Sequence, residues 1–322
     1  MTLKPDINIK HKTSQSLYRK HRFESNMMKS FKEIYENKYK VLLIIPFLIL
    51  ILALLQIGMQ YSFTGEFVNK GITLKGGSTI TITKTSIDVN ELESFLSNKF
   101  PKADINVRTL TIAGKIVSIA IDSDAQENEE IDVLLESIKE KENLDKDDYS
   151  IEVMGSSLGK SFFKQTLIAL LIAFLLMGVV VLIYFRSLAP CLAVMLAAFS
   201  DIVVTLAIFN LTGIKLSTAG IAAFLMLIGY SVDTDILLST RVLKRKEGSV
   251  MERIYGAIKT GLTMSTTTLT AVLVALIFVE SDVIKQIMTI LFIGLLVDLV
   301  MTWIQNVGIL RLYLERKGKK KH

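Results

Sequence analysis

The sequence predicts a polytopic α-helical membrane protein with six transmembrane helices and one external α+β domain between helices 1 and 2. Half of the 322 residues are apolar, and mean hydropathy is positive. Apolar runs long enough to cross a bilayer recur along the chain. The long polar insert, residues 62–160, falls between the first two of these runs.

The chain begins with a polar, basic segment, residues 1–40, before the first apolar run at Val41–Gln60. This run is longer than the core of a signal peptide, which spans about 7–15 residues, and no small-residue cleavage site follows it. The sequence therefore predicts a retained transmembrane helix over residues 41–61.

The insert 62–160 has the patterns of a small α+β domain. Alternating apolar residues predict strands, and apolar residues at helical spacing predict two amphipathic helices. The expected elements are strand Ser78–Lys84, helix Val89–Phe100, strands Ile105–Ile112 and Lys115–Ile121 around the Ala113-Gly114 turn, helix Glu129–Lys141 and strand Tyr149–Met154. This βαββαβ order is the ferredoxin-like arrangement.

Five further apolar spans are expected within residues 161–310, followed by a basic tail over 311–322. The expected spans are Phe162–Tyr184, Leu188–Thr212, Leu216–Leu238, Leu262–Val279 and Ile284–Val307. Lysine and arginine gather at the N-terminus, in the 2/3 and 4/5 loops and in the tail, while acidic residues predominate in the insert. The positive-inside rule then predicts that both termini are cytoplasmic and that the domain lies outside, in a multi-pass protein of the cell membrane.

Carboxylates inside the predicted spans are the main candidates for function. Asp233 and Asp235 follow a long apolar run, and Asp201 and Asp298 fall within spans 3 and 6. An intramembrane carboxylate is costly, about +2.5 to +3.5 kcal/mol at a helix centre on insertion scales, and is a functional-site candidate by default. We interpret Asp233, Asp235 and Asp201 as candidates for an ion or proton relay. The alternative is hydrogen bonding within a packed bundle, which we favour for Asp298 and the threonines of span 5.

Supporting polar residues near these carboxylates are Tyr230, Ser231, Thr260 and Thr267. The sequence predicts no catalytic group, metal site or cofactor. The three histidines lie in the terminal segments, the single cysteine is Cys191, and the glycines of Gly155–Lys160 are too close together for a phosphate-binding loop. We attribute the net charge of +6 to basic terminal segments that orient the protein in the membrane and lie near lipid headgroups. No nucleic-acid partner is therefore expected.

Several stretches together resemble the SecF family of protein-translocase subunits, in its archaeal branch, within the resistance-nodulation-division superfamily. Lys75-Gly76-Gly77-Ser78-Thr79 resembles the family's entry to the external domain, and Gly155-Ser156-Ser157-Leu158-Gly159 resembles its glycine motif before helix 2. Asp201 and Gly229-Tyr230-Ser231 resemble its motifs in helices 3 and 4, and Arg241 matches the arginine that follows. Where bacterial members carry Asn-Asp-Thr and a basic residue, this chain has Asp233-Thr234-Asp235 and Thr260.

The resemblance implies a non-enzymatic subunit that forms a heterodimer with SecD and works beside a SecYE-type channel. It implies that the pair promotes late steps in the translocation of an exported polypeptide, driven by the proton-motive force. Two alternatives remain open at this stage: a passive assembly subunit with no ion pathway, and half of a small-molecule or lipid exporter of the same superfamily.

Overall fold

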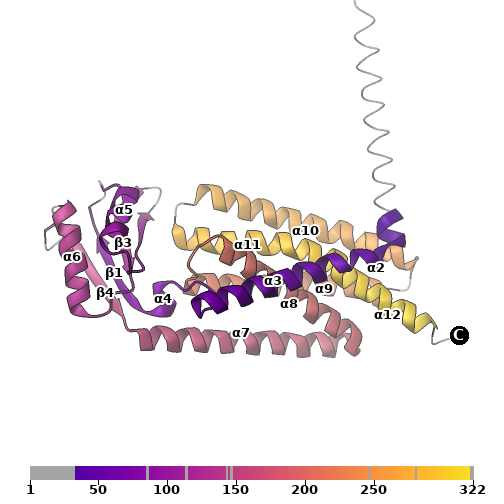
Figure 1. Ribbon diagram of the computed structural model, residues 1–322. Helices are drawn as coiled ribbons and strands as arrows, with labels where there is room; N and C mark the ends of the chain where they lie inside the picture. Colours follow the sequence, from indigo (N-terminus) through magenta and orange to yellow (C-terminus); the bar gives the residue numbers. More distant parts are fainter. Residues whose placement is uncertain are drawn as a thin grey trace, which may run out of the picture.

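The computed structural model describes residues 33–84, 87–112, 115–142, 144–145, 148–245, 247–279 and 281–319. The molecule is elongated, with a sheet domain at one end of a helical bundle (Figure 1). Helix α2 (Tyr39–Leu42) and the last described helix, α12 (Val307–Lys319), both lie at the end opposite the sheet. Most of the predicted N-terminal basic segment, the Ala113-Gly114 turn and the last three residues of the predicted tail fall outside the described residues.

The described residues contain six helical stretches that are long and apolar enough to cross a membrane. The first joins the short helix α2 to α3, and the last joins α11, a π-helix (η1) and α12. Their bounds are Tyr39–Leu42 (α2), Ile44–Thr64 (α3), Ser156–Phe185 (α7), Leu188–Leu211 (α8), Thr218–Leu243 (α9), Val250–Phe278 (α10), Asp282–Val300 (α11), Met301–Asn306 (η1) and Val307–Lys319 (α12).

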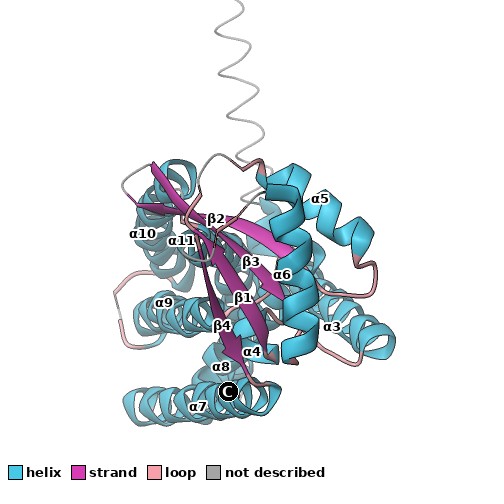
Figure 2. Cartoon of the chain, turned by 90° about the vertical axis from the view of Figure 1, so that its left-hand side faces the viewer, coloured by secondary structure: helices cyan, strands magenta, loops and turns pink. Residues whose placement is uncertain are grey.

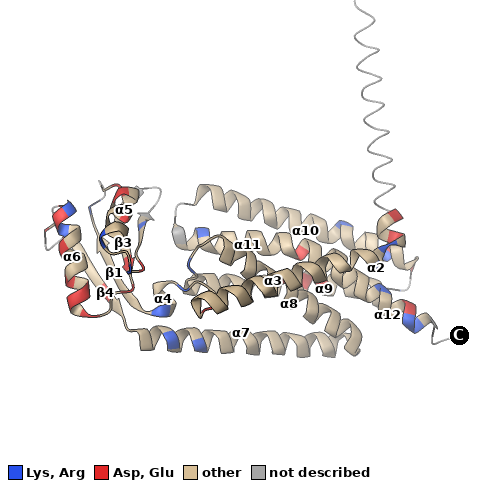
Figure 3. Cartoon of the chain, in the orientation of Figure 1, with Lys and Arg blue, Asp and Glu red and all other residues tan. Residues whose placement is uncertain are grey.

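Two of these helices are longer than their apolar cores. Helix α10 begins at Val250, because Ser249 and Glu252 form a capping box that satisfies backbone N–H groups at its start. The sixth helical stretch continues through the π-helix to Lys319. Both extensions carry basic residues, and both lie at the end of the bundle away from the sheet (Figure 3).

Helices α8 and α9 lie at the centre of the bundle and bury half or more of their residues. Helices α3, α7 and α10 lie at its periphery and expose large apolar side chains along most of their length. An exposed apolar surface of this kind suits contact with lipid tails, because hydrocarbon solvates it without cost.

The sheet domain contains four strands in the order β2-β3-β1-β4, with every adjacent pair antiparallel. Helices α5 and α6 cover one face of the sheet (Figure 2). A core of isoleucine, leucine and valine lies between the two layers. The bounds are Gly77–Ile82 (β1), Val89–Lys99 (α5), Asn106–Ile112 (β2), Lys115–Ser123 (β3), Asn128–Glu142 (α6) and Tyr149–Met154 (β4).

Two glycine motifs meet where the sheet domain joins the bundle. Gly76, after the short helix α4 (Ile72–Lys75), has φ +91°, and a Cβ there would lie 2.4 Å from Cα of Ser156. A Cβ on Gly159 would lie 2.8 Å from the backbone nitrogen of Gly76. The entry and exit of the domain therefore cross at backbone contact, which only glycine permits at these positions.

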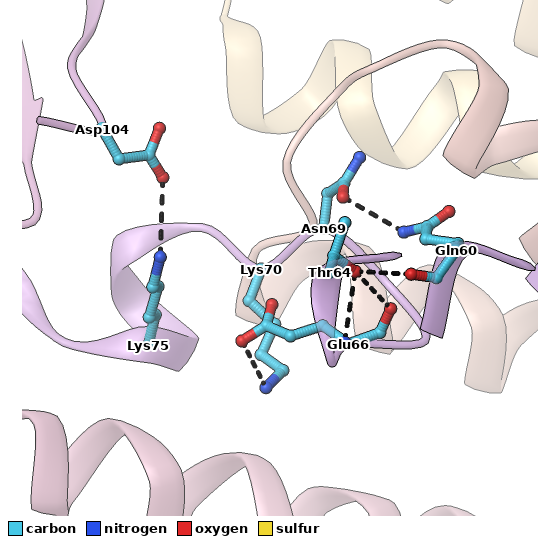
Figure 4. A network of polar contacts seen from close by, with 7 residues as sticks. All are labelled: Gln60, Thr64, Glu66, Asn69, Lys70, Lys75 and Asp104. Atoms are coloured by element: carbon cyan, nitrogen blue, oxygen red, sulfur yellow. Dashed lines mark hydrogen bonds and ion pairs between the residues drawn. The ribbon is translucent and has the colours of Figure 1, made fainter. Parts of the chain in front are cut away.

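A polar network lies along the segment that leads from α3 into α4 (Figure 4). Gln60 donates to Asn69 at 3.1 Å, and Lys70 pairs with Glu66 at 3.1 Å. Further along, Lys75 lies 3.9 Å from Asp104 of the sheet domain, and Lys215 of the α8–α9 loop also pairs with Asp104. Because these pairs are partly solvated, each contributes about 1 kcal/mol or less to stability.

Candidate functional site

Three of the intramembrane carboxyls form one buried cluster. Asp201 on α8 is 1% exposed, and Asp235 on α9 and Asp298 on α11 are fully buried. Asp201 interacts electrostatically with both of the others, and Asp235 with Asp298. The structure thus brings together two carboxyls that the sequence marked as relay candidates and one, Asp298, that it assigned to packing.

Hydroxyl groups contact all three carboxyls, and one of them bridges Asp235 and Asp298. Ser231 donates to Oδ2 of Asp201 at 2.5 Å. Oγ1 of Thr302 lies 3.0 Å from Oδ1 of Asp235 and 2.9 Å from Oδ1 of Asp298. A hydroxyl has one hydrogen and donates to one carboxyl at a time. The other carboxyl can donate to Thr302 only when it holds a proton, so Thr302 is placed to pass a proton between Asp298 and Asp235.

Thr302 belongs to the π-helix, which presents most of its side chains to the interior. Asn306, at the end of this helix, donates to Oδ1 of Asp235 at 2.7 Å. Gln305 donates to Ser200 of α8 at 3.1 Å. A π-turn inside a membrane helix is rare and often marks a functional site, and here it supplies two of the donors to Asp235.

The cluster has no neutralising cation within the described residues. None of the ion pairs between them involves Asp201, Asp235 or Asp298. One oxygen of Asp201 and one of Asp235 are buried without a hydrogen-bond partner in the described part of the chain. Three unpaired negative charges in a low-dielectric interior would be strongly destabilising. The cluster must therefore be neutralised by bound protons or by a positively charged group from outside the described residues.

Asp233 does not join this cluster. Successive residues of an α-helix are about 100° apart, so Asp233 points away from Asp235, and it is exposed on the outside of α9. It forms no hydrogen bond or ion pair with the described residues. Asp233 lies about 15 Å from the end of α9 at a rise of 1.5 Å per residue, well inside the span.

The remaining candidates occupy less central positions. Tyr230 donates to Thr268 at 3.2 Å, while Thr260 and Thr267 donate to backbone carbonyls of their own helix, α10. Gly229 is exposed on α9, and Arg241 donates to the backbone of Gly256 at 2.5 Å. Within the described residues, no group of three or more histidine, cysteine, aspartate or glutamate side chains could hold a metal ion.

The ends nearest the sheet domain of the helices that hold Asp235 and Asp298 are joined by hydrogen bonds. Gln286 of α11 accepts from the hydroxyl of Ser217 at 2.5 Å and donates to the carbonyl of Lys215 at 2.6 Å. Leu216 forms backbone hydrogen bonds with Asn69 and Gly71, on the segment that enters the sheet domain. The starts of α9 and α11 are therefore connected through these hydrogen bonds to the base of that domain.

Sequence reasoning did not identify Thr302, Gln305 or Asn306. They lie at the end of the last apolar span, where neither hydropathy nor periodicity separates them from ordinary interfacial polar residues. The sequence does contain one indication of them. Three polar residues occur within Thr-Trp-Ile-Gln-Asn, which begins one helical turn after Asp298.

Comparison with known proteins gives consistent matches. The family model "Protein export membrane protein SecD/SecF, C-terminal" matches residues 134–316. SecF of Pyrococcus furiosus is 38% identical over 90% of this chain and 96% of its own length. SecF of Methanocaldococcus jannaschii is 40% identical over 88% of this chain and 98% of its own, and SecF of Methanothermobacter thermautotrophicus is 41% identical over 87% and 94%.

Two solved structures share the fold. The crystal structure of SecDF, a translocon-associated membrane protein from Thermus thermophilus, matches with a TM-score of 0.65 and 21% identity over 87% of this chain. SecDF in its super-membrane-facing form matches with a TM-score of 0.57 and 20% identity over 86% of this chain. In each case the present chain spans 38% of the SecDF chain.

Proposed function

Because this chain belongs to the SecF family of protein-export membrane proteins, we propose that it acts with a SecD partner to promote late steps of polypeptide translocation, driven by a proton gradient. The relatives are named as export components rather than enzymes. The partnership with SecD is supported by the match to SecDF, a longer chain of which this one corresponds to a part.

The sheet domain is the extracytoplasmic part of the proposed machine, over residues 62–160. Its strand order β2-β3-β1-β4, with two helices on one face, supports a ferredoxin-like topology. The distribution of basic residues at the opposite end supports cytoplasmic termini, residues 1–40 and 311–322, flanking the helices of 41–61 and 161–310. In that orientation the domain lies where an exported polypeptide leaves a SecYE-type channel.

The observation that carries the coupling proposal is the buried cluster of Asp201, Asp235 and Asp298 without a cation among the described residues. Carboxyls that must be neutralised in place, and that a hydroxyl bridges, can take up and release protons in sequence. One proton that crosses 100 mV releases about 2.3 kcal/mol, enough to shift a conformational equilibrium by almost fifty-fold. The helices that carry the cluster are joined to the base of the sheet domain through Gln286 and Leu216.

The proposed function is tested with vesicles that contain the full-length chain, its SecD partner and the channel. We expect an imposed proton gradient to raise the rate at which a translocation intermediate completes its export by several-fold. Vesicles without this chain, or without SecD, should not show that increase. Equal export with and without the gradient in the complete system would contradict coupling and leave the passive assembly role.

Asp233 supports a more specific proposal about the partner. A charged or even neutral carboxyl facing lipid at this depth is unfavourable, whereas the exposed threonines of α10 satisfy their hydroxyls on their own backbone. The exposed face of α9, which also presents Gly229 and Ala222, therefore packs against the SecD bundle, which supplies a cation or a hydrogen-bond donor to Asp233.

The Asp233→Leu variant is expected to lower the amount of SecD that co-purifies with this chain by about tenfold or more, since a desolvated polar pair is lost. Asp233→Asn should retain part of the binding, because an amide still accepts a hydrogen bond. Leu175→Ala, on the exposed face of α7, serves as the control. Unchanged recovery of SecD with Asp233→Leu would remove this face of α9 from the interface.

A further inference from the structure

The π-helix forms a hydrogen bond with Tyr35, a residue that precedes the first membrane span. The hydroxyl of Tyr35 donates to the backbone carbonyl of Trp303 at 2.7 Å, across 268 residues of chain. Burial raises the pKa of Tyr35 above its usual range, so its hydroxyl remains a hydrogen-bond donor. The backbone of a π-turn is irregular and less stable than that of an α-helix, and Tyr35 satisfies a carbonyl within it.

The segment that carries Tyr35 is itself fixed to α12. Arg311 donates to the carbonyls of Tyr35 at 2.8 Å and Glu36 at 2.7 Å. Its guanidinium group lies 3.9 Å from the centre of the Tyr39 ring, and the hydroxyl of Tyr39 donates to Glu315 at 2.5 Å. An arginine that donates twice and also stacks on a ring fixes a segment in one geometry, which a lysine would not reproduce.

The opposite side of the same turn holds Asp235. Trp303 lies between Thr302 and Asn306, and both of these donate to Oδ1 of Asp235. The indole of Trp303 packs against α10 so closely that a Cβ on Gly261 would lie 2.1 Å from it. Tyr35 therefore contacts the backbone of Trp303, and Gly261 contacts its side chain. A rotation of the π-turn would change the direction of both donors to Asp235.

We propose that Tyr35 is a positioning residue for the carboxyl cluster: its hydrogen bond to Trp303 holds the π-helix in the geometry that directs Thr302 and Asn306 onto Asp235. Release of the Tyr35 segment from Arg311 then changes the environment of a carboxyl deep in the bundle. This link connects the cytoplasmic end proposed above with the buried cluster, and it holds whether or not export uses a proton gradient.

Two readouts on the full-length chain in lipid nanodiscs test the inference. Trp303 is the sole tryptophan of the chain, so intrinsic emission reports on the π-helix directly. A hydrophobic carbodiimide labels protonated carboxyls, and mass spectrometry separates labelling at Asp235 from labelling at Asp201. In Tyr35→Phe we expect a shifted Trp303 emission and about tenfold faster labelling of Asp235, the factor that one charge-assisted hydrogen bond provides, with labelling of Asp201 unchanged.

Matched variants make the outcome decisive. Tyr313→Phe removes a hydroxyl at the same end of the bundle that contacts Ser187 instead of the π-helix, and should leave both readouts at their wild-type values. Arg311→Lys should change them in the same direction as Tyr35→Phe. Unchanged Trp303 emission in Tyr35→Phe would overturn the inference. So would faster labelling of Asp201 and Asp235 together, which would indicate general loosening of the bundle.

Discussion

Replacing Asp235 by asparagine is expected to reduce the ratio of export rates with and without a proton gradient from several-fold to about one. Asparagine has the same shape, and its carbonyl can still accept from Thr302 and Asn306. It cannot take up or release a proton. The measurement is the completion of export in vesicles that contain the SecD partner, with the gradient imposed and then collapsed.

The fold of this variant should be intact. A buried charge without a partner of opposite sign is costly, so replacing this carboxyl by an amide should not lower the midpoint of thermal unfolding. Glu140→Gln, at the exposed ion pair with Lys99, provides a control that should keep the wild-type ratio of rates. If Asp235→Asn still responds to the gradient, the cluster is not the route by which protons drive export.

The second large effect is expected from Gly76→Ala. At φ +91° an alanine is strained by about 1–3 kcal/mol, and its Cβ would approach Cα of Ser156 to 2.4 Å unless the backbone moved. We expect the domain and bundle to lose their contact at this crossing and the midpoint of thermal unfolding to fall by about 5 °C or more.

Gly155→Ala provides a matched control in the same glycine motif, four residues before Gly159. Gly155 has φ −62°, and nothing lies within 4 Å of a Cβ built there, so its unfolding midpoint should change by about 1 °C or less. Equal losses in the two variants would mean that the motif is sensitive to any side chain, and that the close approach at Gly76 is not the cause.

Much of the fold could be predicted because its patterns are local. Strand β4 was predicted at its observed bounds, Tyr149–Met154, and the other elements of the sheet domain within a few residues, since alternation and turn residues determine them. The sequence predicts the start of this span at the edge of its apolar core, Leu262, although Ser249-x-x-Glu252 has the spacing of a capping box that begins α10 earlier. In that case the signal was present in the sequence and outweighed by hydropathy.

The site was less accessible to sequence reasoning, because in a membrane both faces of a helix are apolar. Asp233 and Asp235 are two residues apart and point to different sides, yet hydropathy is alike around both. Steps of three and four residues from Ser231 reach Asp235, Leu238 and Val242, all buried, but only the packed bundle shows that this face is the interior. No sequence pattern predicts the π-turn that brings Thr302 and Asn306 to Asp235.

The attachment of the sheet domain has a mechanical consequence. The chain enters the domain at Gly77 and leaves it at Met154, and these two residues are paired across β1 and β4, with Gly155 alone between β4 and α7. Two adjacent connections of this kind resist translation of the domain and favour its rotation about one axis, as in hinge motion. We therefore expect the domain to rotate about this attachment, so that a small displacement near Leu216 produces a larger displacement at the far end of α6.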